Sequence, residues 1–207
     1  MYQRLREAAH HGFVKRSDRR AENLGRQLLQ YLTDATRHEA ADVLRAATFE
    51  PARDTGPVRQ PGLVPIDFER ETLAGGLAGR GFDPAQQTFF TWLGVVPYLT
   101  EEAVWSTLGF IASLPNGAHV VFDYSDPPDS LSAEMRQLHE RRAARVAELG
   151  EPWVNYFESE KLHAKLTALG FASIEDLGPP GIAARYFPSR AASVPARGGH
   201  ILRAANT

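Results

Sequence analysis

Acidic side chains follow two apolar segments of the sequence that have the length and composition of buried strands. Asp67 comes after "LVPI" with Phe68 beside it, and Asp123 and Asp126 end the run "AHVVFDYSD". In open α/β sheets, ligands bind beyond the carboxyl ends of the strands. Either aspartate alone fits an ordinary strand-end carboxylate that accepts backbone hydrogen bonds. Together, at successive strand ends, they indicate a ligand site.

A third strand end lies between them, in the stretch "QTFFTWLGVVPYLTEE" at residues 87–102. Its apolar run is interrupted by Gly94 and Pro97 and is followed by Thr100, which is a favourable first residue for a helix. We therefore expect a buried strand that delivers a loop shaped by glycine and proline to the same edge. Tyr98 in this loop, with Asp123, is the best placed candidate for orienting a substrate.

The elements that position these residues alternate between strand and helix from residue 63 onward, which predicts a largely parallel sheet. Strands are expected at 63–67, 88–95, 118–124, 171–177 and 199–205. Helices are expected at 69–77, after Thr100, along the charged segment 135–149, and at 159–169, where Gly170 provides the stop. The glycine-rich segment 75–81 follows a helix rather than a strand, so it is predicted to end that helix and not to bind phosphate.

The first 62 residues differ from the rest of the chain in their sequence pattern. Leucines at helical spacing predict a helix around 24–32, "TRHE" at 36–39 predicts the start of a second one, and residues 51–62 form a proline-rich loop. With 207 residues, the chain is expected to form a single domain, 1–207, in which 1–62 is a divergent helical and loop segment and 63–207 is the α/β body.

The amino-acid composition excludes several classes of protein. Hydrophobic residues make up 43% and charged residues 23%, and no apolar run is long enough to span a membrane, so a cytoplasmic protein without membrane contacts is expected. The chain has no cysteine and a net charge of −2. The basic run "KRSDRR" carries its own aspartate and no aromatic neighbours, so nucleic acid is not an expected partner. The histidines are not spaced as metal ligands, and no metal is expected.

The segments "LVPIDFERETLAGGLAGRGFDPAQQTFFTWLGVVPYL", "EPWVNYFESEKLHAKLTALGFASIEDLGP" and "ARYF" resemble those of bacterial S-adenosylmethionine-dependent O-methyltransferases related to leucine carboxyl methyltransferases. The resemblance covers residues 63 to 204. It implies a class I methyltransferase-like, Rossmann-like α/β fold with a mostly parallel sheet and an antiparallel last strand. It also implies S-adenosyl-L-methionine as cofactor and a small-molecule methyl acceptor as partner.

The resemblance also implies roles for individual residues. Asp67 is expected to face the adenine of the cofactor, with Phe68 beside it, and the loop after the next strand is expected to border the cofactor and the acceptor. The cofactor-binding residues implied in this way are Asp67, Phe68, Trp92, Leu93 and Gly94. The residues implied on the acceptor side are Tyr98, Arg185 and Tyr186, the last two in a segment that resembles the family's substrate-side loop.

One family feature is not found in the sequence. Relatives carry an earlier glycine-rich turn that holds the methionine part of the cofactor, and then an acidic residue for the ribose, of which Asp34 is a faint counterpart. The chain therefore resembles a member that lacks the first two strands, with about five strands and direct pairing between 63–67 and 88–94. Exposed strand edges would then favour a homo-oligomer, and binding of S-adenosylmethionine would be weak or absent.

Two functions from different classes remain open at this point. The first is methyl transfer from S-adenosylmethionine to a carboxyl or hydroxyl oxygen of a small molecule, which needs positioning and one base at most. The second is a non-catalytic methyltransferase-like protein that binds or oligomerises. The residues that replace the glycine turn decide between them.

Overall fold

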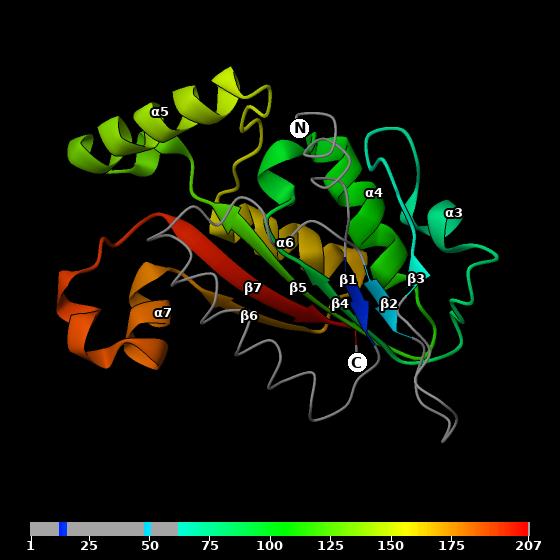
Figure 1. Ribbon diagram of the computed structural model, residues 1–207. Helices are drawn as coiled ribbons and strands as arrows, with labels where there is room; N and C mark the ends of the chain where they lie inside the picture. The colour runs from blue at the N-terminus through cyan, green and yellow to red at the C-terminus, as the bar shows by residue number, and fades with distance from the viewer. Residues whose placement is uncertain (1–12, 16–47, 51–61, 207) are drawn as a thin grey trace.

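The computed structural model describes residues 13–15, 48–50 and 62–206, and these form a mixed α/β structure around one seven-stranded sheet (Figure 1). The strand order is β3-β2-β1-β4-β5-β7-β6. The strands are β1 (Phe13–Lys15), β2 (Thr48–Glu50), β3 (Gly62–Leu63), β4 (Thr88–Trp92), β5 (Ala118–Ser125), β6 (Ser173–Leu177) and β7 (Gly199–Ala205).

The longer strands form one half of the sheet. β4 and β5 run parallel, with Phe90 opposite Val120, whereas β7 runs antiparallel to β5, with Leu202 opposite Phe122. β6 is antiparallel to β7 and therefore points the same way as β4 and β5. The α/β class and the antiparallel last strand expected from the sequence are thus confirmed. The expectation of a largely parallel sheet is corrected, because among the described strands only β1 with β2 and β4 with β5 pair in parallel.

The other half corrects the expectation that the first two strands are missing. Two three-residue strands, β1 and β2, lie between β3 and β4, so the segment at 62–63 pairs with β2 and not with β4. The prediction of about five strands was wrong for the same reason. β1 runs antiparallel to β4, with Val14 opposite Phe90. Strands this short carry too few residues to show a period-2 pattern in the sequence. The predicted helices at 24–32 and from 36 lie outside the described residues.

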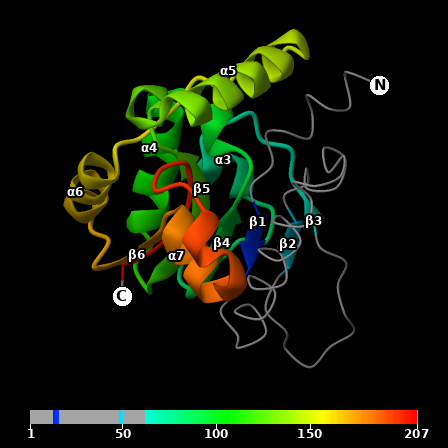
Figure 2. The ribbon, with the colours of Figure 1, turned by 90° about the vertical axis from the view of Figure 1, so that its left-hand side faces the viewer.

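Helices pack on one face of the sheet, and side chains of that face make the core. Phe90, Trp92, Val120 and Phe122 alternate along β4 and β5 with less buried residues, and each is at most 2% exposed. The helices α3 (Leu73–Leu77), α4 (Glu101–Ala112) and α6 (Ser159–Leu169) cover this face in Figures 1 and 2.

The predicted helix limits hold where a capping residue sets them. The Thr100 side chain accepts a hydrogen bond from the Ala103 amide at the start of α4, and Gly170 ends α6 with φ of 106°, a conformation that glycine adopts without strain. The glycine-rich segment does end a helix, since α3 stops at Leu77. The predicted strand at 63–67 is shorter than expected, because only Gly62–Leu63 pairs with another strand.

The carboxyl ends of β4, β5 and β6 and the amino end of β7 share one edge of the sheet, which faces the viewer in Figure 2. Two helices frame this edge, α5 (Ala133–Glu148) above and α7 (Pro179–Tyr186) in front. Short 3-10 turns complete it: η2 (Val96–Tyr98), η3 (Pro128–Ser130) and η4 (Pro188–Ser193). None of the described helices is long and apolar enough to cross a membrane.

Candidate active site

The loop after β4 is held by a carboxylate from the neighbouring strand. The amide of Gly94 donates a hydrogen bond of 2.6 Å to Oδ1 of Asp123 near the end of β5. Gly94 has φ of 70°, the left-handed region that favours glycine, and a Cβ placed there would meet nothing within 4 Å. Glycine therefore lets the chain turn sharply at the strand end, and the turn presents its amide to Asp123.

Asp123 is a carboxyl group at this edge whose acidity is altered by burial. Burial raises the pKa of Asp123 to about 6, and the hydrogen bonds from the amides of Gly94 and of Asp123 itself lower it only in part. No cation is paired with this carboxylate among the described residues. A carboxyl group with a pKa near neutrality can both accept and release a proton under physiological conditions.

The segment before α6 forms a strap across the ends of β4 and β5. The amides of Val154 and Asn155 both donate to the carbonyl of Pro97, at 2.8 and 3.2 Å, and the amide of Phe157 donates to the carbonyl of Ser125 at 3.1 Å. Asn155 is 8% exposed, and its side-chain Nδ2 makes no hydrogen bond. The strap therefore holds the loop at Pro97, whereas Asp123 holds it at Gly94.

Asp67 lies in a tight turn that leads to α3. Its Oδ1 accepts from the amide of Glu69 at 3.1 Å, and its side chain is 37% exposed, 3.7 Å from the guanidinium of Arg70. Glu69 in turn accepts from the amide and the hydroxyl of Thr100, at 2.7 and 2.9 Å. The Asp67 turn is thus tied to the end of the β4 loop through Glu69.

The other residues predicted to bind the cofactor differ in exposure. Phe68 is 4% exposed and Trp92 2%, with ring centroids 5.5 Å apart, so both side chains belong to the core and only their backbones can meet a ligand. Leu93 is half-buried and Gly94 exposed. Tyr98 is half-buried in η2, on the same loop.

Arg185 and Tyr186 lie at the end of α7, which corrects the expectation of a loop for the first part of "ARYF". The guanidinium of Arg185 pairs with Glu175 of β6 and lies 5.8 Å from the ring of Tyr186. The structure therefore places this pair beside β6, at the same edge of the sheet but separated from β4 by the two strands β5 and β7. Asp34 lies outside the described residues.

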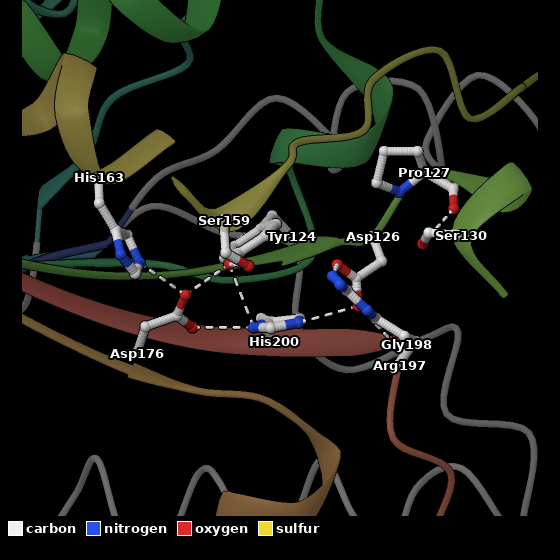
Figure 3. A network of polar contacts seen from close by, with 10 residues as sticks. All are labelled: Tyr124, Asp126, Pro127, Ser130, Ser159, His163, Asp176, Arg197, Gly198 and His200. Atoms are coloured by element: carbon white, nitrogen blue, oxygen red, sulfur yellow. Dashed lines mark hydrogen bonds and ion pairs between the residues drawn. The ribbon is translucent and has the colours of Figure 1, made fainter. Parts of the chain in front are cut away.

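Sequence reasoning missed a network of polar side chains on the far side of β5, shown in Figure 3. His200, the second residue of β7, lies between Asp126 and Asp176: its Nε2 is 3.1 Å from Oδ2 of Asp126, and its Nδ1 is 2.9 Å from Oδ1 of Asp176. We call the following residues the His200 network: Tyr124, Asp126, Ser159, His163, Asp176, Arg197 and His200.

The carboxylates of this network are buried and compensated. The side chain of Asp126 is fully buried and accepts from Arg197 at 3.2 Å and from the amide of Gly198 at 2.9 Å. Burial acts to raise the pKa of Asp176, but hydrogen bonds from His200, Tyr124 and His163 outweigh it, so that pKa is lowered. No group of three His, Asp or Glu in the described part of the chain could hold a metal ion.

Comparison with known proteins finds similarity to methyltransferases. The sequence profile described as leucine carboxyl methyltransferase matches residues 37–112, which include Asp67, β4, its loop and the whole of α4. A candidate S-adenosyl-L-methionine-dependent methyltransferase of Bacillus subtilis (strain 168), YktD, is 30% identical over 129 residues. The chain is therefore similar to leucine carboxyl methyltransferases over residues 37–112.

The extent of these matches matters for what they imply. The alignment with YktD covers 62% of this chain but 42% of the relative, so the chain spans less than half of the length of that protein. The family profile begins at residue 37, inside the segment that was expected to diverge. The family resemblance seen in the sequence is confirmed, and the roles of single residues stay predictions.

Proposed function

We propose that the protein transfers a methyl group from S-adenosylmethionine to an oxygen of a small molecule, at the edge formed by β4 and β5. The observation that carries this proposal is the loop Gly94–Leu99, held between Asp123 and the strap at residues 154–157. It lies beside the half-exposed Asp67, in a chain that is similar to methyltransferases.

The residues present fit part of the cofactor. The Asp67 carboxylate is positioned by its own turn, is 37% exposed and has acceptor capacity left for the amino group of adenine. Gly94 and Leu93 form a loop whose backbone a ligand can approach, because Gly94 has open space where a side chain would be. When bound, S-adenosylmethionine supplies an electrophilic methyl group on a sulfonium.

Asp123 gives the reaction its base. A hydroxyl oxygen that attacks the methyl carbon forms the new carbon–oxygen bond while the carbon–sulfur bond breaks, and the hydroxyl proton goes to the Asp123 carboxylate. A pKa of about 6 keeps this carboxylate ionised at neutral pH. A carboxylate acceptor has no proton to lose, so the presence of Asp123 favours a hydroxyl acceptor over a carboxyl one. Tyr98 is the residue that orients this acceptor.

Calorimetric titration with S-adenosylhomocysteine and S-adenosylmethionine tests the cofactor part. We expect weak, millimolar binding, because the sequence shows no glycine-rich turn, and a further loss in Asp67→Ala. Asp83→Ala is the matched control, since Asp83 makes the same kind of turn, accepting from the Ala85 amide at 3.0 Å, on the same connection. Equal binding by Asp67→Ala and the parent protein, or no binding at any concentration, contradicts the proposal and favours a non-catalytic binding or oligomerising protein.

Methyl transfer itself is tested with tritium-labelled S-adenosylmethionine and two panels of acceptors, phenols and carboxylic acids. The expected result is labelling of the phenols, with a rate that rises with pH through about 6 as Asp123 ionises. Asp123→Asn should abolish that labelling, because an amide cannot take the proton. Labelling of carboxylic acids that survives Asp123→Asn overturns the role given to Asp123.

A further inference from the structure

His200 connects every segment that frames the β6 side of the edge. Its ring stacks on Tyr124 of β5 with centroids 4.6 Å apart, and it contacts Asp126 after β5 and Asp176 within β6. A Cβ on Gly178, the residue immediately before α7, would come within 2.9 Å of the His200 ring. A single side chain thus packs against the ends of two strands and the start of a helix.

The contacts of the two ring nitrogens define the charge state of His200. A neutral imidazole has one N–H and one lone pair, whereas the imidazolium has two N–H donors. Both nitrogens face carboxylate oxygens, on Asp126 and Asp176, whose side chains are 0% and 8% exposed. Only the imidazolium donates to both, and a neutral ring would point a lone pair at a buried carboxylate.

The other groups around His200 do not replace that charge. The hydroxyl of Tyr124 lies 3.1 Å from Nδ1 but donates to Asp176 at 2.5 Å and also meets Ser159 of α6 at 2.8 Å. His163 of α6 contacts the other oxygen of Asp176 at 2.8 Å and is 38% exposed. Arg197 reaches Asp126 from a side chain that is 57% exposed.

We propose that His200 is a protonation-dependent latch: its imidazolium holds the segment 178–198 against the ends of β5 and β6, and loss of the proton releases that segment. The segment contains α7, with Arg185 and Tyr186, and it returns to the sheet through Gly198. The amide of Gly198 donates to Asp126, and its carbonyl accepts from the Asp126 amide at 2.9 Å (Figure 3). The latch therefore sets the position of the acceptor-side helix, whichever acceptor is used.

The pH dependence has a definite sign. Burial acts to lower the pKa of His200, but its hydrogen bonds to Asp176 and Asp126 outweigh burial, so the pKa is raised above its usual 6.5. A raised pKa in the folded protein means that the stabilisation is fully present below about pH 6.5 and is lost as the pH rises through the folded value. The latch is closed below about pH 6.5 and opens as the pH rises through the pKa of His200 in the folded protein.

Two measurements on the unmodified protein test this. Nuclear magnetic resonance of the ¹⁵N-labelled histidine rings should show His200 with both nitrogens protonated at pH 6 and a midpoint above 6.5. Hydrogen exchange, corrected for the intrinsic rate at each pH, should show that protection of the Gly198, Ile182 and Phe187 amides falls at least tenfold across that midpoint. Amides of α4 and α6 should keep their protection. A midpoint below 6.5, or protection in 178–198 that ignores the titration, overturns the proposal.

Two variants separate the latch from general pH sensitivity. Asp176→Asn can place its amide nitrogen where Oδ1 faces Nδ1 of His200 and keep an oxygen for Tyr124 and His163, so the neutral ring is satisfied and the step in protection should be lost. His163→Gln keeps both carboxylates on His200, so the step should remain. A step that persists unchanged in Asp176→Asn, or vanishes in His163→Gln, contradicts the latch. If Asp176→Asn does not fold, the result with the unmodified protein decides.

Discussion

The two sides of β5 are held in different ways, although the carboxylates responsible are only three residues apart. On the β4 side, Asp123 holds the loop with a single side-chain hydrogen bond to the Gly94 amide and has no cation beside it among the described residues. On the β7 side, Asp126 receives hydrogen bonds from Arg197, Gly198 and His200 and is fully buried.

The difference shows how one strand end can hold two carboxylates in different environments. Burial without a compensating charge raises the pKa of Asp123. Charge-assisted hydrogen bonds make Asp126 an anchor for the residues that donate to it. Period-2 alternation separates the two, because Asp123 lies on the face opposite to Phe122 and Tyr124, while Asp126 follows the end of the strand.

The largest effect is expected from Asp126→Ala. It leaves His200 and Arg197 without their shared partner and should lower the free energy of unfolding by about 3–5 kcal/mol at pH 6. Urea denaturation measures this loss. Asp123→Ala is the comparison, and it should cost far less because no buried cation loses a partner; equal losses would erase the contrast between the two sides.

Tyr124→Phe should lower the free energy of unfolding by about 2 kcal/mol, because the phenol donates a short hydrogen bond to the ionised Asp176 on the β7 side. Tyr156→Phe also removes a phenol oxygen. In the parent protein that oxygen lies 3.0 Å from Nε2 of His139 in α5, at a more exposed position. We expect this control to lower the free energy of unfolding by less than about 1 kcal/mol in the same urea denaturation measurement. A larger loss in the control would show that the network adds nothing beyond ordinary burial.

Asp123→Asn should stabilise the protein at alkaline pH. The folded pKa of about 6 lies above the unfolded 3.8, so the folded state is favoured by protonation, and that advantage is lost as the pH rises through 6. An amide avoids the buried charge, which should raise the free energy of unfolding by about 1–2 kcal/mol at pH 8 and by nothing below pH 3.8. Thermal unfolding at the two pH values checks this, and destabilisation at pH 8 would contradict it.

Gly94→Ala should have the smallest effect, a loss of about 1 kcal/mol, because alanine is strained at a φ of 70° while its Cβ meets no neighbour. Gly109→Ala in α4 is the matched substitution, and it should stabilise by about 0.5–1 kcal/mol through helix propensity. The two melting temperatures should move in opposite directions. A shift in the same direction would show that Gly94 does not need its left-handed conformation.

Local signals allowed much of this structure to be predicted from sequence. β4, β5, α4 and α6 are long enough to show their periods, and Thr100 and Gly170 mark helix limits by chemistry that depends on a few neighbours. β1 and β2 were missed because strands of three residues have no measurable period. Asp67 was singled out by its place after an apolar run and by family resemblance, and its turn shows why that place is well ordered.

The His200 network was missed because its members come from distant parts of the chain. Asp126 and His200 are separated by 74 positions, and no spacing rule joins them. The sequence did contain a signal. Tyr124, Asp176 and His200 lie two positions from Phe122, Ile174 and Leu202 in their strands, and therefore on the same face of the sheet, which packs against the helices. Polar residues on an otherwise apolar face must satisfy one another, which predicts a cluster without saying what it does.

Helix α5 is held firmly at its two ends and only lightly along its length. No residue within Ala133–Glu148 is buried, yet the chain is fixed before it by the buried Leu131 and after it by the strap on Pro97 and Ser125. Along its length the helix is held through His139, whose Nε2 lies 3.0 Å from the hydroxyl of Tyr156 and whose ring also contacts Trp153. A helix held at its ends and through one side chain can change in length or sequence with little effect on the strands beneath it, so α5 can vary in evolution while the strand ends that hold the loop stay as they are.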